Sequence, residues 1–278
     1  MTSNTEHPRH PEAYMHDYDG ALTEHIIAGR TADIHGAFFL PYLRAGMDVL
    51  DCGCGPGTIT AGLAQAASPG KVTGIDLEES QLDHARENAA GLGLTNVAFA
   101  SGGVHDLPYQ DNLFDAVFSH AMLEHMHDPL AVLAEMRRVL KPGGLAAIRC
   151  IDLGATLIAP ADAAVTKAYE IWLKFRRHCG GDPFMGRRLR ALLREAGFAK
   201  TIGTASSEAW GTPQSTPTIM SALTGEITGP RITEIALQLG WADQAQMDKA
   251  ARALKDWGDH PDAFMAIVWC EAVGWIPE

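Results

Sequence analysis

The stretch VLDCGCGPGT at residues 49–58 decides the fold of this chain. Two apolar residues lead into an acid, glycines follow at every second position, and a helix-compatible segment continues to Ala67. This order predicts a strand, a tight turn and a helix. Glycine lets the backbone turn sharply and approach a ligand closely because it has no Cβ atom, and the start of a helix presents unpaired N–H groups. The stretch therefore predicts a site for a nucleotide-like ligand.

Further apolar segments alternate with helical ones, which is typical of a parallel sheet. The segment at residues 71–76 ends in Asp76, about 20 residues past the glycine loop, where an acid holds ribose hydroxyls. Strands are also predicted at residues 96–100, 113–120 and 145–151. Ligands of open α/β sheets bind outside the carboxyl ends of the strands. We therefore expect the first four strand ends to converge on one crevice: Asp51, Asp76, Ala100 and Ser119.

The glycine spacing distinguishes between two kinds of nucleotide site. The dinucleotide fingerprint Gly-x-Gly-x-x-Gly needs a third glycine at position 58, which is Thr58, and Gly57 comes one residue early. As Asp-x-Gly-x-Gly-x-Gly, the loop resembles motif I of the class I S-adenosylmethionine-dependent methyltransferases. That ligand has no pyrophosphate, and Asp51 can meet its cationic ammonium directly or through water. A glycine-rich turn without a ligand is the alternative for the loop taken alone.

Four later signals make the resemblance specific, in the order and at the intervals of the type 11, UbiE/COQ5-like methyltransferases. They are Phe114-Asp115 at a strand start, Leu123-Glu124-His125, Asp128-Pro129 at a helix start, and KPGG at residues 141–144. With motif I they cover about residues 44–151. Short motifs have a high false-positive risk one by one, so the ordered set carries the resemblance.

The resemblance implies a set of residues around S-adenosylmethionine and its product S-adenosylhomocysteine. In this sequence the positions are Arg30, Asp51, Gly53, Cys54, Gly55, Asp76, Leu77, Gln81, Gly103, Val104, His105 and Ser119. Leu77 would pack on adenine, and the backbone N–H of Val104 would meet an adenine ring nitrogen. The family usually has an aspartate where this chain has Gly103, so the adenine amino group must go to water, a backbone carbonyl or His105.

A helical lead-in is expected before the first strand, at residues 14–43, after a polar tail. Related enzymes carry a tyrosine, an arginine, Leu-Pro and Gly-Met here, and this chain has Tyr18, Arg30, Leu40-Pro41 and Gly46-Met47. Arg30 is either a surface arginine or a ligand of the cofactor carboxylate, to which a guanidinium can donate two hydrogen bonds.

The expected fold is α/β: a Rossmann-like, seven-stranded, mostly parallel sheet with an antiparallel last strand, N-terminal helices and a helical cap inserted before the last strand. The sixth strand is expected at residues 198–206 and the seventh at 263–273. The predicted divisions are a tail and lead-in at 1–43, a cofactor-binding core at 44–208 and 262–278, and a cap at 209–261. A structureless loop as long as the last segment would count against the assignment, but inserted helices do not.

Composition limits the classes of partner. The chain has 278 residues, 46% of them hydrophobic, and a formal net charge of −12, which argues against nucleic acid or an anionic membrane as the main target. We expect no membrane span, because no apolar run reaches about 18 residues, and no secretory signal. Five scattered cysteines fit a reducing cytoplasm, and Cys52-x-Cys54 lacks a second pair for a metal site.

The acceptor side is less defined by sequence. Asp152 follows the fifth strand, and Trp210 lies near the cap, which we expect to roof an apolar acceptor pocket. Methyl transfer from a sulfonium is an in-line displacement in which the protein supplies orientation and a dry pocket. A phenol or alcohol acceptor needs a base, and His120 and His125 are candidates, although either can have a lining or packing role. A thiol acceptor would need no base.

The sequence thus predicts a methyltransferase that moves a methyl group to an O, S, N or C atom of a small apolar or aromatic molecule. Two alternatives are a nicotinamide-dependent oxidoreductase, against which Thr58 and the KPGG segment argue, and a cofactor-binding protein without transfer activity, for which Gly103 is the only support. The sequence does not identify the acceptor or the oligomeric state.

Overall fold

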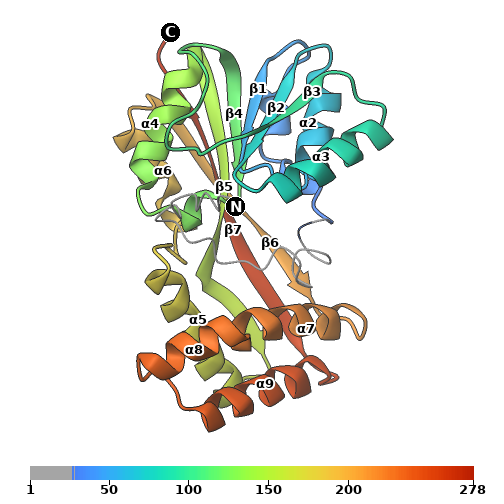
Figure 1. Ribbon diagram of the computed structural model, residues 1–278, viewed down its shortest axis with the longest axis vertical. Helices are drawn as coiled ribbons and strands as arrows, with labels where there is room; N and C mark the ends of the chain where they lie inside the picture. The colour runs from blue at the N-terminus through green and yellow to red at the C-terminus, as the bar shows by residue number, and fades with distance from the viewer. Residues whose placement is uncertain (1–26, 28) are drawn as a thin grey trace, which may run out of the picture.

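The computed structural model describes residues 27 and 29–278. The predicted polar tail and Tyr18 of the lead-in lie outside these residues. Figure 1 shows an upper body, in which helices flank a sheet, and a lower group of helices reached by the long strands β5, β6 and β7.

The sheet has seven strands in the order β3-β2-β1-β4-β5-β7-β6. Strands β1 to β5 are mutually parallel, and β7 runs antiparallel to both β5 and β6, as the sequence predicted. Asp51 pairs with Gly74 on one side and with Phe118 on the other. The strands are β1 (Val49–Cys52), β2 (Val72–Asp76), β3 (Val97–Ser101), β4 (Phe114–His120), β5 (Leu140–Ala159), β6 (Lys200–Trp210) and β7 (Phe264–Trp275).

Two hydrophobic clusters cover the two faces of the upper sheet. Successive residues of a strand point to opposite faces, so Val117 belongs to the cluster under α4 (Pro129–Val139) and α6 (Leu189–Glu195), whereas Phe118 belongs to the cluster under α2 (Thr58–Ala67). Helix α3 (Glu79–Gly91) packs beside β3. Helix α4 begins where Asp128 accepts a hydrogen bond from the amide of Ala131 and a proline occupies the first turn, a favourable helix start.

The helices in the described part of the lead-in are shorter than the helical region predicted at residues 14–43. That part contains α1 (Ala32–His35) and the 3-10 helix η2 (Leu40–Tyr42), because Gly36 ends the first and Pro41 restricts the second. Phe39 between them is fully buried and stacks on Phe118, with ring centroids 5.6 Å apart. The lead-in is therefore anchored to the sheet close to the end of β4.

Strands β5 and β6 extend past their predicted ends, and together with β7 they reach into the lower body. Strands β5 and β7 pair as far as Ala159 and Phe264, past an irregularity between Asp152 and Leu157. The expected strands at residues 145–151 and 198–206 cover only the upper parts of β5 and β6, whereas the one at 263–273 already includes the lower part of β7. The extended part of these strands could not be recognised from the spacing of apolar residues alone. Helices α5 and α7 cover it, and the alternation of apolar and polar residues along it is weak.

The cap contains one helix more than the sequence assigned to it. Helices α7 (Ser215–Thr228), α8 (Pro230–Gln238) and α9 (Gln244–Gly258) fall inside the predicted 209–261 segment. Helix α5 (Ala163–His178), which the prediction placed in the core, packs in the same hydrophobic cluster. Its apolar stripe, including Trp172 and Phe175, faces α7 and α9 rather than the upper sheet.

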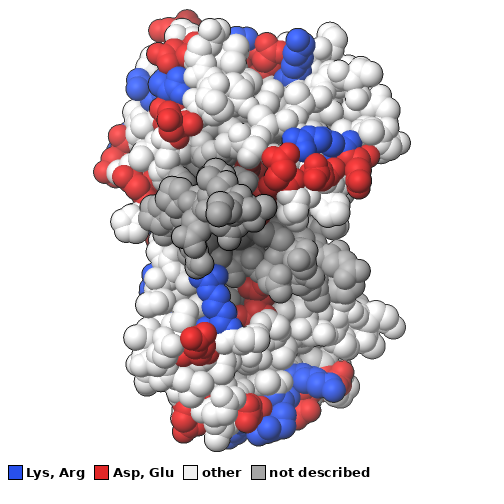
Figure 2. Space-filling view, in the orientation of Figure 1, with Lys and Arg blue, Asp and Glu red and all other residues white. Residues whose placement is uncertain are grey.

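Charged side chains are mixed on the face that Figure 2 shows, with lysine and arginine interspersed among acidic groups on both bodies. Across the part of the chain that the structure describes, no helix combines the length and apolar composition needed to cross a membrane.

Candidate functional site

The glycine loop connects β1 to α2 in a conformation that requires glycine. Gly53, Gly55 and Gly57 all have positive φ, with 51° at Gly55 and 72° at Gly57. A Cβ atom at Gly57 would lie 2.6 Å from the Cβ atom of Ala85 on α3, whereas one at Gly55 would meet nothing within 4 Å. Gly57 therefore permits close packing of the loop against α3, and Gly55 borders open space at the carboxyl edge of the sheet.

Asp76 at the end of β2 is tied to this loop. Its Oδ2 accepts a 2.8 Å hydrogen bond from the amide of Gly55, and its Oδ1 accepts one of 3.1 Å from the amide of Glu78. Burial raises the pKa of Asp76, and these amide hydrogen bonds oppose the rise. The adjacent Leu77 is 47% exposed, so an apolar side chain stands uncovered beside the carboxylate.

Asp51 is buried at the end of β1 and accepts a 2.6 Å hydrogen bond from the hydroxyl of Thr60 on α2. Burial raises the pKa of Asp51 to about 7, with Thr60 opposing the shift and the charge of Asp76 adding to it. Burial thus disfavours the negative charge of both acids in spite of these hydrogen bonds, and a nearby cation would favour their ionised forms.

The other predicted cofactor residues gather around the same edge. Ser119 is fully buried and donates a 3.0 Å hydrogen bond to the carbonyl of Cys52, which joins β4 to β1. Burial raises the pKa of the Cys54 thiol far above its usual range, so this thiol is not a nucleophile. Gln81 on α3 is buried, and its Oε1 has no hydrogen-bond partner within the described chain.

Gly103, Val104 and His105 follow β3. A Cβ atom at Gly103 would meet only a methyl group of Leu77, at 3.8 Å, so this position has room for a side chain. Val104 is buried, and His105 is partly exposed. The roles of all these residues toward a cofactor stay predictions, although β1, β2, β3 and β4 bring them to one edge of the sheet.

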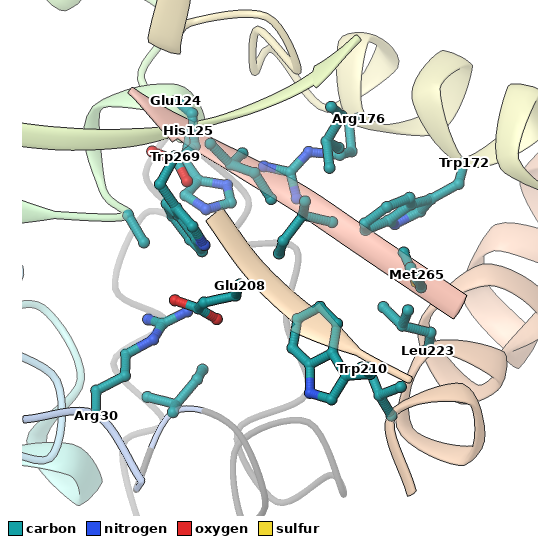
Figure 3. Close-up of a pocket in the computed structure, with 16 residues that line it drawn as sticks. Arg30, Glu124, His125, Trp172, Arg176, Glu208, Trp210, Leu223, Met265 and Trp269 are labelled. Carbon is teal, nitrogen blue, oxygen red and sulfur yellow. The ribbon is translucent and has the colours of Figure 1, made fainter. Parts of the chain in front are cut away.

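A pocket lies between this edge and the cap, with about 750 Å³ of empty space that includes its open side. Figure 3 shows the tryptophans on β6, β7 and α5 around it, and Arg30 reaching in from the lead-in. Most of the lining is aromatic or aliphatic. The lining residues are Ile27, Arg30, Ala121, Glu124, His125, Ile151, Leu153, Trp172, Arg176, Glu208, Trp210, Ile219, Leu223, Met265, Ile267 and Trp269.

Arg30, Trp210 and the candidate base His125 are the residues of this wall that the predictions assigned to the site. The guanidinium of Arg30 lies 5.5 Å from the ring centroid of Trp269, within the range of a cation–π contact. Arg30 therefore lies between this pocket and the edge of the sheet (Figure 3). Whether it contacts the cofactor stays a prediction.

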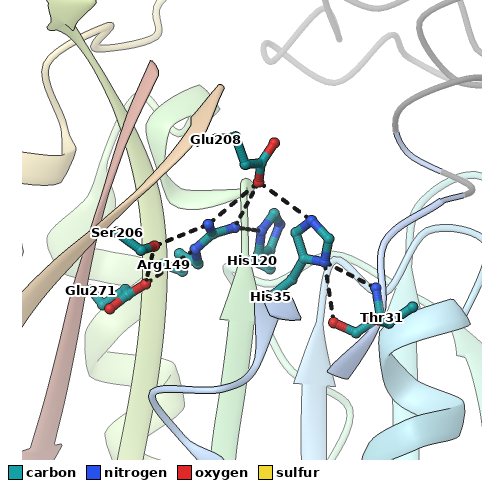
Figure 4. Close-up of polar contacts among 7 residues, drawn as sticks. All are labelled: Thr31, His35, His120, Arg149, Ser206, Glu208 and Glu271. Atoms are coloured by element: carbon teal, nitrogen blue, oxygen red, sulfur yellow. Dashed lines mark hydrogen bonds and ion pairs between the residues drawn. The ribbon is translucent and has the colours of Figure 1, made fainter. Parts of the chain in front are cut away.

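A buried ionic network underlies the pocket wall. Arg149 on β5 is 1% exposed; its guanidinium lies 3.4 Å from carboxylate oxygens of both Glu271 on β7 and Glu208 on β6. Glu208 also lies 3.3 Å from Nε2 of His35 on α1. Figure 4 shows these contacts in one continuous chain. The network fixes the lead-in, the sheet and a pocket-lining carboxylate relative to one another.

His120 belongs to this network rather than to the pocket lining. Its Nε2 lies 2.6 Å from Nη1 of Arg149, and its ring packs on Trp269 at a centroid distance of 5.0 Å. Burial, and then the positive charges of Arg30 and Arg149, lower the pKa of His120 well below its usual value. The prediction that His120 is a base stays untested, and this geometry leaves its Nε2 engaged.

Asp152 also differs from its predicted surroundings. Its two carboxylate oxygens accept 2.6 Å hydrogen bonds from Nε and Nη2 of Arg187, and the amides of Gly154 and Arg187 donate two more. A carboxylate offers about four acceptor positions, so these partners occupy it. Asp152 is not among the residues that line the pocket, and its predicted substrate role finds no support in this geometry.

Sequence reasoning missed several members of the wall. The predictions assigned no role in the site to Trp172, Arg176, Glu208 or Trp269, all of which line the pocket. One signal could have found the network: Arg149 is a charged residue inside the apolar stretch LAAIRCID at residues 145–152, and a buried charge requires a partner. The partners come from distant segments, so the sequence alone could not name them.

Comparisons with known proteins agree with this geometry. Residues 43–197 match the family described as a methyltransferase domain. The "Probable methyltransferase ltbC" of Aspergillus luteorubrus is 32% identical over 265 residues, which are 88% of this chain and 91% of that protein. An uncharacterized methyltransferase of Schizosaccharomyces pombe is 32% identical over 203 residues, or 71% of this chain and 72% of that protein. A demethylmenaquinone methyltransferase of Staphylococcus aureus is 37% identical over 134 residues, covering 48% of this chain and 52% of its own length.

Solved structures share the fold. The YcgJ protein from Bacillus subtilis superposes with a TM-score of 0.58 at 20% identity, over 87% of this chain and 97% of that one. The phosphoethanolamine N-methyltransferase 2 of Haemonchus contortus, solved with phosphomonomethylethanolamine and S-adenosylhomocysteine, gives 0.53 at 21% identity, over 85% of this chain and 50% of that one. At these identities the likeness concerns the fold alone.

Proposed function

This chain belongs to the class I S-adenosylmethionine-dependent methyltransferases, and on that premise we propose that it methylates a small apolar or aromatic molecule held in the pocket between sheet and cap. The position of the pocket carries the proposal. Its wall includes Ala121, Glu124 and His125, which directly follow β4, and the carboxyl end of β4 adjoins that of β1. An acceptor in this pocket would thus lie next to the predicted cofactor crevice.

The residues at the edge of the sheet fit the cofactor. Asp76 has a carboxylate suited to ribose hydroxyls, and the exposed Leu77 offers an apolar surface for adenine. Asp51, whose charge is unfavourable in isolation, suits the cationic ammonium group. The buried Oε1 of Gln81 lacks a donor that a ligand could supply. When bound, S-adenosylmethionine supplies an electrophilic methyl group, and the protein supplies binding and orientation.

The lining of the pocket supports an apolar or aromatic acceptor. Trp172, Trp210 and Trp269 present three large flat surfaces, with Leu223 and Met265 between them. Aromatic side chains contribute much of the binding energy of such pockets because they bury large areas and stack on flat ligands. The charged groups of the wall are few and of both signs: Arg30, Arg176, Glu124 and Glu208. The proposed acceptor is therefore a mainly apolar molecule with a small number of polar atoms.

The protein would act through orientation and exclusion of water. The cap covers the acceptor on one side, and the fixed lead-in places Arg30 at the other. Holding two reactants in line removes a large entropic barrier. We also propose the division of the chain that the sequence predicted, with α5 added to the cap at 209–261 and the remaining core as the cofactor-binding unit.

Two experiments test the proposal. Calorimetric titration with S-adenosylhomocysteine and with NAD should show binding of the first and not of the second. Arg30→Ala should weaken S-adenosylhomocysteine binding by roughly 1.5–3 kcal/mol if its guanidinium meets the cofactor carboxylate, and an unchanged dissociation constant would remove Arg30 from the cofactor site.

The second experiment measures transfer of labelled methyl groups to a panel of phenols, thiols, amines and quinones. Turnover confined to apolar or aromatic members is expected. Filling the pocket with Leu223→Trp should suppress that turnover while S-adenosylhomocysteine still binds. Equal turnover by the filled variant would contradict the assignment of the pocket to the acceptor.

A further inference from the structure

Glu124 is a carboxylate buried in the wall of the acceptor pocket. It is 2% exposed, and its Oε2 has no hydrogen-bond partner among the described residues. A buried acceptor atom without a donor is unfavourable, and more so when the group is ionised. Native structures seldom keep such an atom without a reason. The atom therefore indicates a donor that the ligand brings.

The backbone holds Glu124 at the end of the pocket nearest the sheet. Strand β4 ends at His120, Ala121 adopts a left-handed conformation with φ of 54°, and its amide donates to the carbonyl of Arg149. Glu124 follows in the 3-10 helix η3 (Leu123–His125), and its carbonyl accepts from the amide of Asp182. Figure 3 shows its carboxyl group beside His125 and Trp269. The side chain is thus fixed close to the predicted cofactor crevice.

The surroundings of Glu124 suit a proton acceptor. Burial raises the pKa of its carboxyl above the usual range. The positive charge of Arg176 on α5, a hydrogen bond with Cys150 on β5 and the charge of Arg30 in the lead-in lower it in turn. Burial therefore strengthens the base, while the two arginines favour its ionised form. A general base needs both properties near neutral pH.

The two histidines nearby are weaker candidates on geometry. Nε2 of His120 accepts from Arg149, and His120 does not line the pocket. His125 lines the pocket but is only partly buried. It therefore serves as a comparison residue in the test.

We propose that Glu124 accepts the proton of a hydroxyl group on the methyl acceptor, and that the acceptor is an aromatic compound with an acidic hydroxyl, such as a phenol or naphthol. This inference rests on the proposed function. The O–H bond of the acceptor breaks, the proton moves to Oε2 of Glu124, and the electron pair left on oxygen forms the new bond to the methyl carbon. The electron pair of the former carbon–sulfur bond remains on sulfur.

Two indole groups in the pocket wall can bind a second oxygen atom of the ligand. Nε1 of Trp172 and Nε1 of Trp269 are buried, and neither has a hydrogen-bond partner in the described chain. Both tryptophans line the same pocket as Glu124. An indole nitrogen is only a donor, so an oxygen of the ligand can satisfy it. The wall therefore places a buried carboxylate oxygen and two indole N–H donors on one mainly apolar surface.

The test uses the full chain and 2-naphthol, with and without S-adenosylhomocysteine. Excited naphthol is a strong acid and emits as naphtholate when a base lies next to its hydroxyl, so emission reports proton acceptance without turnover. Wild-type protein should bind 2-naphthol more tightly than naphthalene and shift its emission to that of naphtholate. Glu124→Gln should weaken naphthol binding roughly 10- to 100-fold, as for loss of a hydrogen bond to a charged group, and abolish the shift.

Three variants complete the test. The exposed Glu195→Gln on α6 should leave both naphthol affinity and the emission shift intact. His125→Asn should change naphthol affinity, because His125 lines the pocket, but should keep the naphtholate emission that Glu124→Gln loses. If Glu124→Gln fails to fold by circular dichroism, Glu124→Asp serves instead, because its shortened carboxylate should reduce the shift. An unshifted emission in wild type, equal naphthol affinity in Glu124→Gln, or loss of the shift in His125→Asn would overturn the inference. Absence of naphthol binding while S-adenosylhomocysteine binds would also overturn it and leave the methyltransferase assignment intact.

Discussion

Nη1 of Arg149 lies 2.6 Å from Nε2 of His120, and both side chains are buried. A guanidinium can only donate hydrogen bonds, so Nε2 of His120 is the acceptor and the imidazole carries its hydrogen on Nδ1. Burial and the charges of Arg30 and Arg149 lower the pKa of His120. His120 is therefore a neutral partner of Arg149 in the folded protein.

This pairing predicts acid sensitivity. The folded state disfavours protonation of His120, whereas the unfolded state accepts a proton near pH 6.5. The stabilising contribution is therefore present above that pH and lost as the pH falls below it. Between about pH 7 and pH 5 the free energy of unfolding should fall by roughly 1–2 kcal/mol more in wild type than in His120→Asn. Chemical denaturation at both pH values measures this difference, and parallel losses in the two proteins would contradict it.

Arg149 should be one of the most sensitive positions for stability. Arg149→Met leaves Glu208 and Glu271 without their buried counter-charge. Breaking a buried ion pair by removing one partner costs about 3–5 kcal/mol. Urea denaturation should show a loss of that order, while the exposed Arg252→Met on α9 should change stability by less than about 0.5 kcal/mol. A loss below about 1 kcal/mol for Arg149→Met would show that the network does not hold the strands together.

Asp51 should have opposite effects on stability and on binding. Its folded pKa of about 7 lies above the model-peptide value of 3.8, so its contribution to stability is present at low pH and lost as the pH rises through about 7. Asp51→Asn removes the buried charge and should raise the free energy of unfolding at about pH 8, by at most roughly 4 kcal/mol. The same change should weaken S-adenosylmethionine binding, because the ammonium loses its carboxylate. Thermal unfolding and calorimetry measure the two effects, and a fall in both would contradict this account.

The cofactor edge could be predicted from sequence because its signals are local. The glycine loop, the acid at the end of β2 and the segment after β4 each follow their strand within a few residues, and parallel strands bring their carboxyl ends together. The resemblance supplied the seven strands and the antiparallel last strand, and the order of strands comes from the structure. Nothing in these inferences required knowledge of contacts between distant segments.

The sequence predicted an apolar pocket under the cap near Trp210, but most of the residues that line the pocket could not be predicted in this way. Trp172, Trp269 and Glu208 lie on three elements separated by many residues, and they meet where β5, β6 and β7 continue past the end of β4. The apolar residues of α5 have the spacing of any amphipathic helix. This spacing indicates that one face of the helix is buried, but it does not indicate which element packs against that face. Asp152 shows a related difficulty: an acid after a strand suggested a substrate ligand, and the sequence did not indicate that Arg187 would pair with it.

Gly103 allows a direct test of how adenine is recognised. The resemblance places an aspartate here, and a Cβ atom at Gly103 would make only an ordinary contact with Leu77. Gly103→Asp should therefore fold normally and bind S-adenosylhomocysteine several-fold more tightly, because the new carboxylate can accept the adenine amino group. Gly57→Asp is the matched control; its Cβ atom would clash with Ala85, and φ is positive, so it should be strongly destabilised. Weaker binding by a stable Gly103→Asp would show that adenine does not reach this position.

Leu223 separates the acceptor pocket from a second, smaller cavity in the cap. That cavity holds about 230 Å³ of empty space, and Leu223 and Met265 line both. Leu223→Ala should join them and allow acceptors with longer apolar substituents, because the added volume continues the apolar wall. The truncation should also cost roughly 2–3 kcal/mol of stability, as for other buried leucines.

Leu254→Ala is the matched control for this change, because Leu254 is equally apolar and lines only the smaller cavity. It should lose similar stability and leave acceptor size unchanged, since Leu223 still closes the pocket. Relative turnover of phenols with short and long alkyl chains distinguishes the two variants, independently of their stability. If both variants shifted the preference equally, loosening of the cap and not the joined volume would explain the effect. If neither did, the acceptor would bind nearer the sheet and leave the cap side of the pocket empty.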